Sequence, residues 1–280
     1  MTPRRGPRRA TTLAGMAIVG ALALSALLAP WLAPGDPGLI DPAGAFAGSS
    51  AAHWLGTDNL GRDVLGRLLL GGRWSLGIAA IATALVMTIG VSVGLVAGYA
   101  GGLVDDVLMR LVDALLSVPT LLLALAIVGT LGPGIASLTI GLAGIWWVNT
   151  ARVVRGMVCS LRERGHVQAA RALGASDARI MRRHILPGIL PMLAVLSALE
   201  MGELILAISG LSFLGLGAQP PAAEWGAMLN DARTYFFVEP RLVLYPGLAV
   251  TGAVAGFTLL GDGLRDALDR QHDAMPGRTR

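Results

Sequence analysis

The chain has 280 residues, of which 54% are hydrophobic and only 14% charged, and its net charge of +4 comes from 22 Arg without a single Lys. A soluble domain carries about 25% charged residues, so this composition is typical of a membrane protein. The absence of Lys excludes a phosphate-binding Walker loop. The arginines flank apolar stretches and do not form one basic face, so we expect no nucleic-acid partner.

Six stretches are apolar and long enough to cross a bilayer, for which a helix needs about 20 mostly apolar residues. They cover residues 13–33, 76–98, 114–131, 135–151, 188–209 and 242–261. Gly132, Pro133 and Gly134 separate the third stretch from the fourth, and they predict a tight turn between antiparallel helices. The sequence therefore predicts an all-α membrane protein with six transmembrane helices.

The first apolar stretch could instead be a secretory signal, because four arginines precede it. These are Arg4, Arg5, Arg8 and Arg9. The apolar run is longer than the 7–15 residues of an ordinary signal core. Five more stretches follow, so we expect the first to remain as an uncleaved membrane helix.

The distribution of arginine predicts the orientation, since cytoplasmic loops of membrane proteins are rich in positive charge. The N-terminal tail has four Arg and no acidic residue, and segment 151–187 has eight Arg and two acidic residues. Segments 34–74 and 211–241 have slightly more acidic residues than Arg. With six spans, the tail and 151–187 fall on the same side. We therefore predict that both termini and segment 151–187 are cytoplasmic.

Segment 151–187 is polar although it lies between two apolar spans. Residues 167–173 are good helix formers, and Gly174 suits the left-handed position that ends a helix. Ser176 then suits an N-cap, and Asp177 is favourable at the positive start of the next helix. We expect Pro187 to end that second helix before the next span.

Two interpretations of this helix pair remain open from the residues alone. A basic, amphipathic pair can lie on anionic lipid, with Ile180, Met181 and Ile185 on one face. It can also dock in a groove of a soluble partner. The adjacent small residues Ala169 and Ala170 favour docking, because a lipid-bound helix would carry bulkier apolar side chains.

Two carboxylates lie inside a predicted span, Glu200 and Glu203, three residues apart and so near one helix face. Charged residues inside a membrane usually face the interior of a helix bundle or a water-filled path. One hypothesis is that they line a substrate path. The other is that Glu203 lies at the outer interface and Glu200 pairs with a neighbour.

No arrangement of residues predicts catalysis or a metal site. The four histidines, His53, His166, His184 and His272, are scattered without ligand spacing, and Cys159 has no partner for a disulfide. Asp58, Arg62 and Asp63 are interpreted as a polar cluster that stabilises the outer face. We expect no enzymatic activity in this chain.

Four motifs, taken in chain order, resemble the C-type permease subunits of bacterial dipeptide, oligopeptide and nickel ABC importers. They are His53-Trp-Leu-Gly-Thr-Asp-Asn-Leu-Gly-Arg-Asp63; Gln168-Ala-Ala-Arg-Ala-Leu-Gly174 with Leu186-Pro187; Leu211-Ser-Phe-Leu-Gly-Leu-Gly-Ala-Gln-Pro-Pro221; and Gly261-Asp-Gly-Leu-Arg-Asp-Ala-Leu-Asp269. Gln168 departs from the pattern, since the family usually has Glu there.

The resemblance implies the ABC importer permease fold with a cytoplasmic coupling helix. Residues 1–75 would form the first helix and an extracytoplasmic segment, residues 76–270 a five-helix core, and residues 271–280 a cytoplasmic tail. Segment 151–187, here called the coupling loop, would contact an ATPase. The residues implied in that contact are Gln168, Ala169, Ala170, Gly174, Leu186 and Pro187.

The same resemblance implies the partners and the location of the protein. The chain would pair with a second, homologous permease in the inner membrane, in contact with lipid. Two cytoplasmic ATPase subunits would bind Mg-ATP, so this chain would bind no cofactor. An extracytoplasmic substrate-binding protein would deliver the cargo.

The cargo stays open between two classes. Residues 223–233, with Glu224-Trp-Gly226 and then Asn230-Asp-Ala-Arg233, look more like the nickel branch. The two carboxylates in the fifth span also suit a cation, so nickel, as an ion or a chelate, is the favoured cargo. Di- or oligopeptides are the alternative. A self-sufficient secondary transporter is a further alternative, but it would not need the coupling loop.

Overall fold

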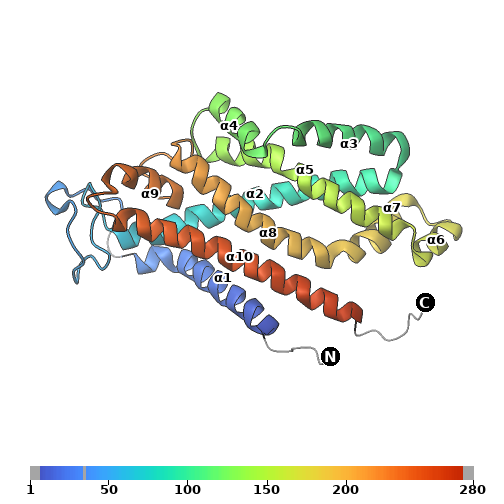
Figure 1. Cartoon of the computed structure of the whole chain (residues 1–280), viewed down its shortest axis with the longest axis horizontal. Helices are drawn as coiled ribbons and strands as arrows, with labels where there is room; N and C mark the ends of the chain where they lie inside the picture. The colour runs from blue at the N-terminus through green and yellow to red at the C-terminus, as the bar shows by residue number, and fades with distance from the viewer. Residues whose placement is uncertain (1–6, 34–35, 274–280) are drawn as a thin grey trace.

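In the computed structural model, residues 7–33 and 36–273 are described, and within these ranges the chain is helical without a β-strand. Arg4, Arg5 and residues 274–280, which entered the predictions of orientation and of a cytoplasmic tail, lie outside the described residues. Figure 1 shows the ten α-helices, which run mostly along one axis. Their bounds are α1 Pro7–Leu32, α2 Val64–Ala100, α3 Gly102–Leu116, α4 Thr120–Leu131, α5 Ile135–Arg162, α6 Gly165–Ala172, α7 Asp177–Ile180, α8 Leu186–Phe213, α9 Trp225–Ala232 and α10 Arg241–Asp273.

Three short turns complete the described elements. They are the 3-10 turns η1 (Pro42–Gly44) and η3 (Arg233–Tyr235) and the π-helical turn η2 (Met181–Ile185). Because η2 is helical, α7, η2 and α8 form one continuous helix from Asp177 to Phe213. The prediction that Pro187 ends a helix is therefore wrong. Proline cannot donate to the preceding turn, and the wider π-helical turn before it allows the helix to continue.

Four described helices are long and apolar enough to span a membrane, or five if one bent pair counts as a span. The four cover Thr11–Leu32, Val64–Ala100, Asp177–Phe213 and Arg241–Leu268. The predicted fourth span, 135–151, lies within α5, which is long enough but is not among these apolar helices. Helix length and composition therefore support four or five membrane spans in the described residues, and not the six that the sequence predicted.

The prediction of one continuous helix over 114–131 is wrong. α3 ends at Leu116, α4 begins at Thr120, and the two helices are bent by 82° at the break. Pro119 is the residue before α4, and a proline disfavours helical backbone in the residue that precedes it. The predicted turn at Gly132–Gly134 is confirmed, and α4 packs against α5 where Ala124 and Val128 lie over Gly141.

The core lies where α2, α5, α8 and α10 meet. Ala82 and Val86 of α2 and Ile205 of α8 are among its fully buried side chains. Gly90, Gly94 and Gly98 recur every fourth residue along α2 and face α5. A Cβ added at Gly94 would lie 2.5 Å from the carbonyl oxygen of Ala151, so these glycines permit backbone contact between the helices.

The two ends of the molecule carry different elements (Figure 1). Segment 36–63 and α9 lie at one end, and α6 and α7 lie at the other. The beginning of α1 and the end of α10 are both directed toward the end that carries α6 and α7. The start of α1, the end of α10 and the coupling loop thus share one end of the molecule, and the side of the membrane that this end faces stays a prediction.

Candidate functional site

The coupling loop ends its first helix at Gly174, as predicted. Gly174 has φ of +79°, a left-handed conformation that favours glycine. Its backbone N–H donates to the carbonyl of Arg171 at 3.0 Å, and that of Ala175 donates to Ala170 at 3.1 Å. These bonds satisfy carbonyls at the end of α6, as in a Schellman turn. Glycine therefore sets the angle between α6 and α7.

Ser176 lies at the predicted N-cap position of α7, but its side chain makes no capping hydrogen bond in the structure. Asp177 follows in the first turn, as predicted. Its carboxylate is engaged by a distant residue, since the Tyr99 hydroxyl donates to Asp177 Oδ1 at 2.6 Å. The start of this helix is thus held by α2 and not by its own cap.

The part of the coupling loop that follows α5, from α6 to η2, packs its inner face against the transmembrane helices. Val167, Ile180 and Ile185 are fully buried in one cluster with Val154 and Val158 of α5. Ala170 and Leu186 pack at the edge of this cluster. The prediction that Ile180 and Ile185 share an apolar face is confirmed, and that face meets protein in the structure.

The outer face of the coupling loop is exposed. Ala169, Gly174 and Pro187 are exposed, and the Leu173 side chain is 88% exposed. The two alanines of the motif thus differ, since Ala169 faces outward and Ala170 inward. A groove of about 350 Å³ beside this face is lined by Ser176, Ala178, Arg179, Arg182 and Arg183. The exposed surface is therefore a small apolar patch next to positive charge.

Gln168, where the motif departs from its family pattern, has a defined role in the structure. Its side-chain Nε2 donates to the carbonyl oxygen of Arg162 at 3.0 Å, at the last residue of α5. A glutamate could not donate this hydrogen bond. Gln168 therefore joins α6 to the end of α5.

Glu200 and Glu203 lie in different surroundings although they are three residues apart. Glu200 is 8% exposed, and the Thr150 hydroxyl of α5 donates to its Oε1 at 3.0 Å. Its Oε2 has no hydrogen-bond partner among the described residues. Glu203 is exposed on the surface of α8. Within the described residues, a neutral hydroxyl and not a cation meets Glu200.

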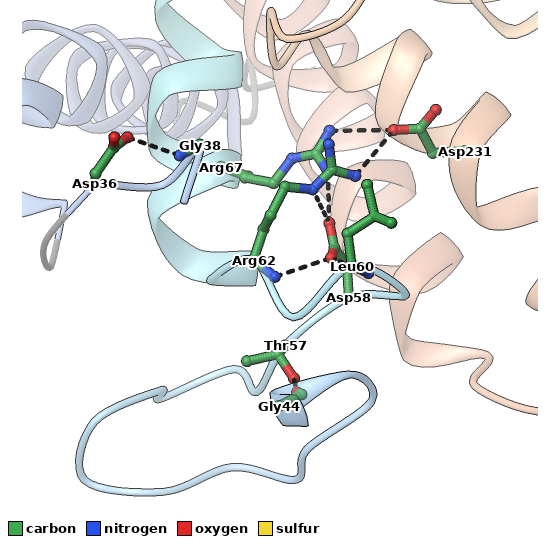
Figure 2. Close-up of polar contacts among 9 residues, drawn as sticks. All are labelled: Asp36, Gly38, Gly44, Thr57, Asp58, Leu60, Arg62, Arg67 and Asp231. Atoms are coloured by element: carbon green, nitrogen blue, oxygen red, sulfur yellow. Dashed lines mark hydrogen bonds and ion pairs between the residues drawn. The ribbon is translucent and has the colours of Figure 1, made fainter. Parts of the chain in front are cut away.

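At the opposite end of the molecule, two arginines lie between two aspartates (Figure 2). Asp58 accepts from Arg62 Nε at 2.8 Å and from Arg67 Nη1, and all three side chains are buried. Arg67 Nη2 donates to Asp231 of α9 at 3.1 Å. We call Asp58, Arg62, Arg67 and Asp231 the outer ion cluster. It fixes segment 36–63 and α9 to the start of α2.

The outer ion cluster confirms part of the sequence prediction and corrects part. Asp58 and Arg62 pair as expected. Asp63 does not join them, because it caps α2 through Gly66 and contacts His53 Nδ1 at 2.9 Å. Arg67 and Asp231 were missed. They are 164 residues apart, and no local pattern links them.

The Glu224-Trp-Gly226 motif is structural in this chain. The buried Glu224 carboxylate accepts from the N–H groups of Gly226 and Ala227 and from the Ser75 hydroxyl at 2.9 Å. The Trp225 indole donates to the carbonyl oxygen of Leu68 at 3.0 Å. These bonds join α9 to α2. The motif therefore has a reason to be present that does not depend on the cargo.

The histidines are less scattered than the sequence suggested. His166 and His184 come from the two halves of the coupling loop, and their ring centroids are 6.2 Å apart. His272 lies among the residues whose side chains are not described. No group of three or more His, Cys, Asp or Glu side chains in the described ranges could hold a metal ion.

Comparisons with known proteins agree with this architecture. Residues 90–272 match the family described as "Binding-protein-dependent transport system inner membrane component". The chain is 44% identical over 252 residues to the nickel transport system permease protein NikC of Escherichia coli (strain K12), covering 90% of this chain and 91% of that protein.

Two further relatives are named for other cargoes. The glutathione transport system permease protein GsiD of Pectobacterium atrosepticum is 45% identical over 222 residues, covering 79% of this chain and 74% of the relative. The dipeptide transport system permease protein DppC of Alkalihalophilus pseudofirmus is 41% identical over 257 residues, covering 92% of this chain and 84% of the relative. All three relatives are named as permeases, and none as an enzyme.

Proposed function

The chain belongs to the family of binding-protein-dependent inner-membrane transport components and is a permease of its peptide and nickel ABC importers, and from this premise we propose how it works. It forms half of a translocation path with a second, homologous permease. Two ATPase subunits on the cytoplasmic side bind Mg-ATP and hydrolyse it. The chain itself has no Lys for such a site and binds no cofactor.

The exposed face of the coupling loop carries the proposal. Leu173 extends from a surface of small residues that includes Ala169 and Gly174, and Arg179, Arg182 and Arg183 line the groove beside it. A partner groove with an apolar floor and an acidic rim would bury the leucine and pair with the arginines. We assign that groove to the ATPase, with Gln168, Ala170, Leu186 and Pro187 supporting the contact.

In the membrane we propose six spans with the coupling loop in the cytoplasm. The four continuous apolar helices supply four of them, the bent α3–α4 pair a fifth, and α5 the sixth. Both termini then lie in the cytoplasm of the bacterial cell, as the excess of Arg predicts. Segments 36–63 and 214–240 face outward, where a substrate-binding protein delivers cargo.

For the cargo we propose nickel, as an ion or a chelate. Two observations support it: the match covers 91% of the nickel permease, against 74% and 84% of the two other relatives, and Glu200 and Glu203 lie in one span of α8. Carboxylate oxygens attract a divalent cation or a cationic complex to the path. A short peptide is the second candidate, because relatives named for glutathione and dipeptide match over 222 and 257 residues.

The test is reconstitution of the complete importer in proteoliposomes, with the second permease, both ATPases and the binding protein. We expect ATP-dependent uptake that requires the binding protein and that favours radioactive nickel over labelled dipeptide or glutathione. Uptake of peptide without uptake of nickel would show that the cargo is a peptide, and it would leave the proposed ATP-driven mechanism unchanged. Uptake driven by an ion gradient without ATP would instead support a secondary transporter and overturn the proposal.

A further inference from the structure

Helix α2 connects the two ends of the molecule. It has 37 residues, which corresponds to about 55 Å of helix. Its first turns carry Arg67 of the outer ion cluster and Ser75, which binds Glu224. Its last turn carries Tyr99, beside the coupling loop. A single rigid element therefore contacts both α9 at one end and the coupling loop at the other.

Tyr99 contacts both helices of the coupling loop. Its hydroxyl donates to Asp177 Oδ1 of α7 at 2.6 Å. The guanidinium carbon of Arg171, in α6, lies 5.4 Å from the centroid of the Tyr99 ring, within the range of a cation–π contact. Tyr99 itself is 8% exposed. One buried side chain of α2 is thus held by polar contacts from both sides of the turn at Gly174.

The hydrogen bond has the properties of a directional link. A phenol donating to a carboxylate is a charge-assisted bond, stronger and geometrically stricter than apolar packing. Asp177 is in the first turn of the continuous helix that becomes α8. A cavity of about 430 Å³ lies beside the contact, lined by Val96, Tyr99, Ala100, Arg171, Asp177 and Met181. The bond therefore lies at the edge of an open pocket, with space on one side of it.

We propose that Tyr99 is a positioning residue through which movement of the coupling loop is transmitted to α2. The inference rests on the proposed function and adds the route that the motion takes. The coupling loop pulls or pushes α2 through the Tyr99–Asp177 bond. α2 in turn moves α9 and segment 36–63, which are fixed to its other end.

The test compares Tyr99→Phe, which removes the hydroxyl and keeps the ring, with the wild type in the reconstituted importer. We expect Tyr99→Phe to keep complex yield and basal ATPase activity within about twofold, while cargo taken up per ATP hydrolysed falls at least about fivefold. Tyr235→Phe is the matched control at the outer end, where the ring contacts Phe46. It should keep the wild-type ratio.

A double-mutant cycle separates transmission from general damage. Asp177→Ala, which removes the acceptor, should lower the uptake per ATP like Tyr99→Phe, and the double variant should be no worse than either single variant, because all three lose the same bond. Additive losses, or an unchanged ratio in Tyr99→Phe, would overturn the inference. If Tyr99→Phe assembles poorly, Asp177→Ala at the exposed end of the bond carries the test alone, and an unchanged ratio there overturns the inference. A wild-type complex without ATP-driven uptake would refute the proposed function instead.

Discussion

Gly174 shows how one residue sets the geometry of the coupling loop. An added Cβ would meet no atom within 4 Å, so space around it is open. The constraint is the backbone, because φ of +79° costs an L-residue roughly 1 kcal/mol or more. A bulky side chain would also protrude into the face that we assign to the ATPase.

We expect Gly174→Leu to uncouple or disassemble the importer while membrane insertion of the permease survives. Gly174→Ala should give a weaker defect, because it adds the backbone strain of roughly 1 kcal/mol without the bulk. The measurements are co-purification of the ATPase and stimulation of ATP hydrolysis by the loaded binding protein. Gly165→Ala is the matched control, because Gly165 also lies in open space but has no positive φ. Normal uptake in Gly174→Leu would contradict the docking assignment.

The surroundings of Glu200 predict how the loss of its charge affects stability. Among the described residues, the neutral Thr150 hydroxyl donates to its Oε1, and its Oε2 has no hydrogen-bond partner. Glu200→Gln therefore strands no charge within this chain. Removing the buried charge relieves its desolvation cost, so stability should hold or rise slightly.

We expect Glu200→Gln to reduce uptake severalfold while the yield of intact complex and basal ATPase activity stay normal. Yield and uptake must be measured together, because loss of assembly would mean that the carboxylate pairs with a cation on the partner permease. Glu203→Gln, at an exposed position of the same helix, is the comparison. Normal yield with normal uptake of both nickel and peptides would remove Glu200 from the path.

At the scale of elements, α2, α9 and segment 36–63 form one unit at the outer end. Arg67 is buried and bonds both aspartates of the outer ion cluster, whereas the Asp231 side chain is 37% exposed. Removing one member of a buried ion pair leaves its partner charged and desolvated, at a cost of about 3–5 kcal/mol. An ion pair at a partly exposed position contributes about 1 kcal/mol or less.

We therefore expect Arg67→Met to destabilise the permease strongly and Asp231→Asn to do so only slightly. Thermal unfolding of the purified complex in detergent measures the difference, with Arg67→Met unfolding at the clearly lower temperature. Arg73→Met, a few residues further along α2 and outside the cluster, controls for the loss of an arginine. Equal shifts in Arg67→Met and Asp231→Asn would mean that the cluster does not act as a buried unit.

At the scale of the whole molecule, the two ends should face opposite sides of the membrane. Phe237 is 95% exposed at the end with α9, and Leu173 is 88% exposed at the end with α6. These positions are suited to labelling, since a cysteine at either is accessible and disturbs no packing. The excess of Arg near Leu173 predicts that this end lies in the cytoplasm.

After Cys159→Ala, we expect a membrane-impermeant thiol reagent to label Phe237→Cys in intact cells, once the outer membrane is permeable. Leu173→Cys should react only after the inner membrane is disrupted. The Cys159→Ala chain without a new cysteine measures background labelling. Labelling of Leu173→Cys from outside would overturn the proposed orientation.

The sequence alone determined features that depend on neighbouring residues. Apolar runs predicted most helices, Gly174 predicted the turn after α6, and the close pair Asp58 and Arg62 was expected to interact. Such features follow from backbone propensity and from the short separation of the residues along the chain. The same rules treated prolines as helix ends. That rule failed at Pro187, where the helix continues, and we did not apply it at Pro119, where the predicted span 114–131 is broken between α3 and α4.

Only the tertiary structure decided which distant residues meet. Arg67 bonds Asp231 across 164 positions, Ser75 bonds Glu224 across 149, and Tyr99 bonds Asp177 across 78. These pairs depend on how α2 lies against α9 and the coupling loop, and that depends on packing of the whole bundle. The π-helical turn before Pro187 has the same origin, because burial of Ile180 and Ile185 favours one continuous helix over a break. Local sequence determines the helices, and their mutual packing determines the contacts that join them.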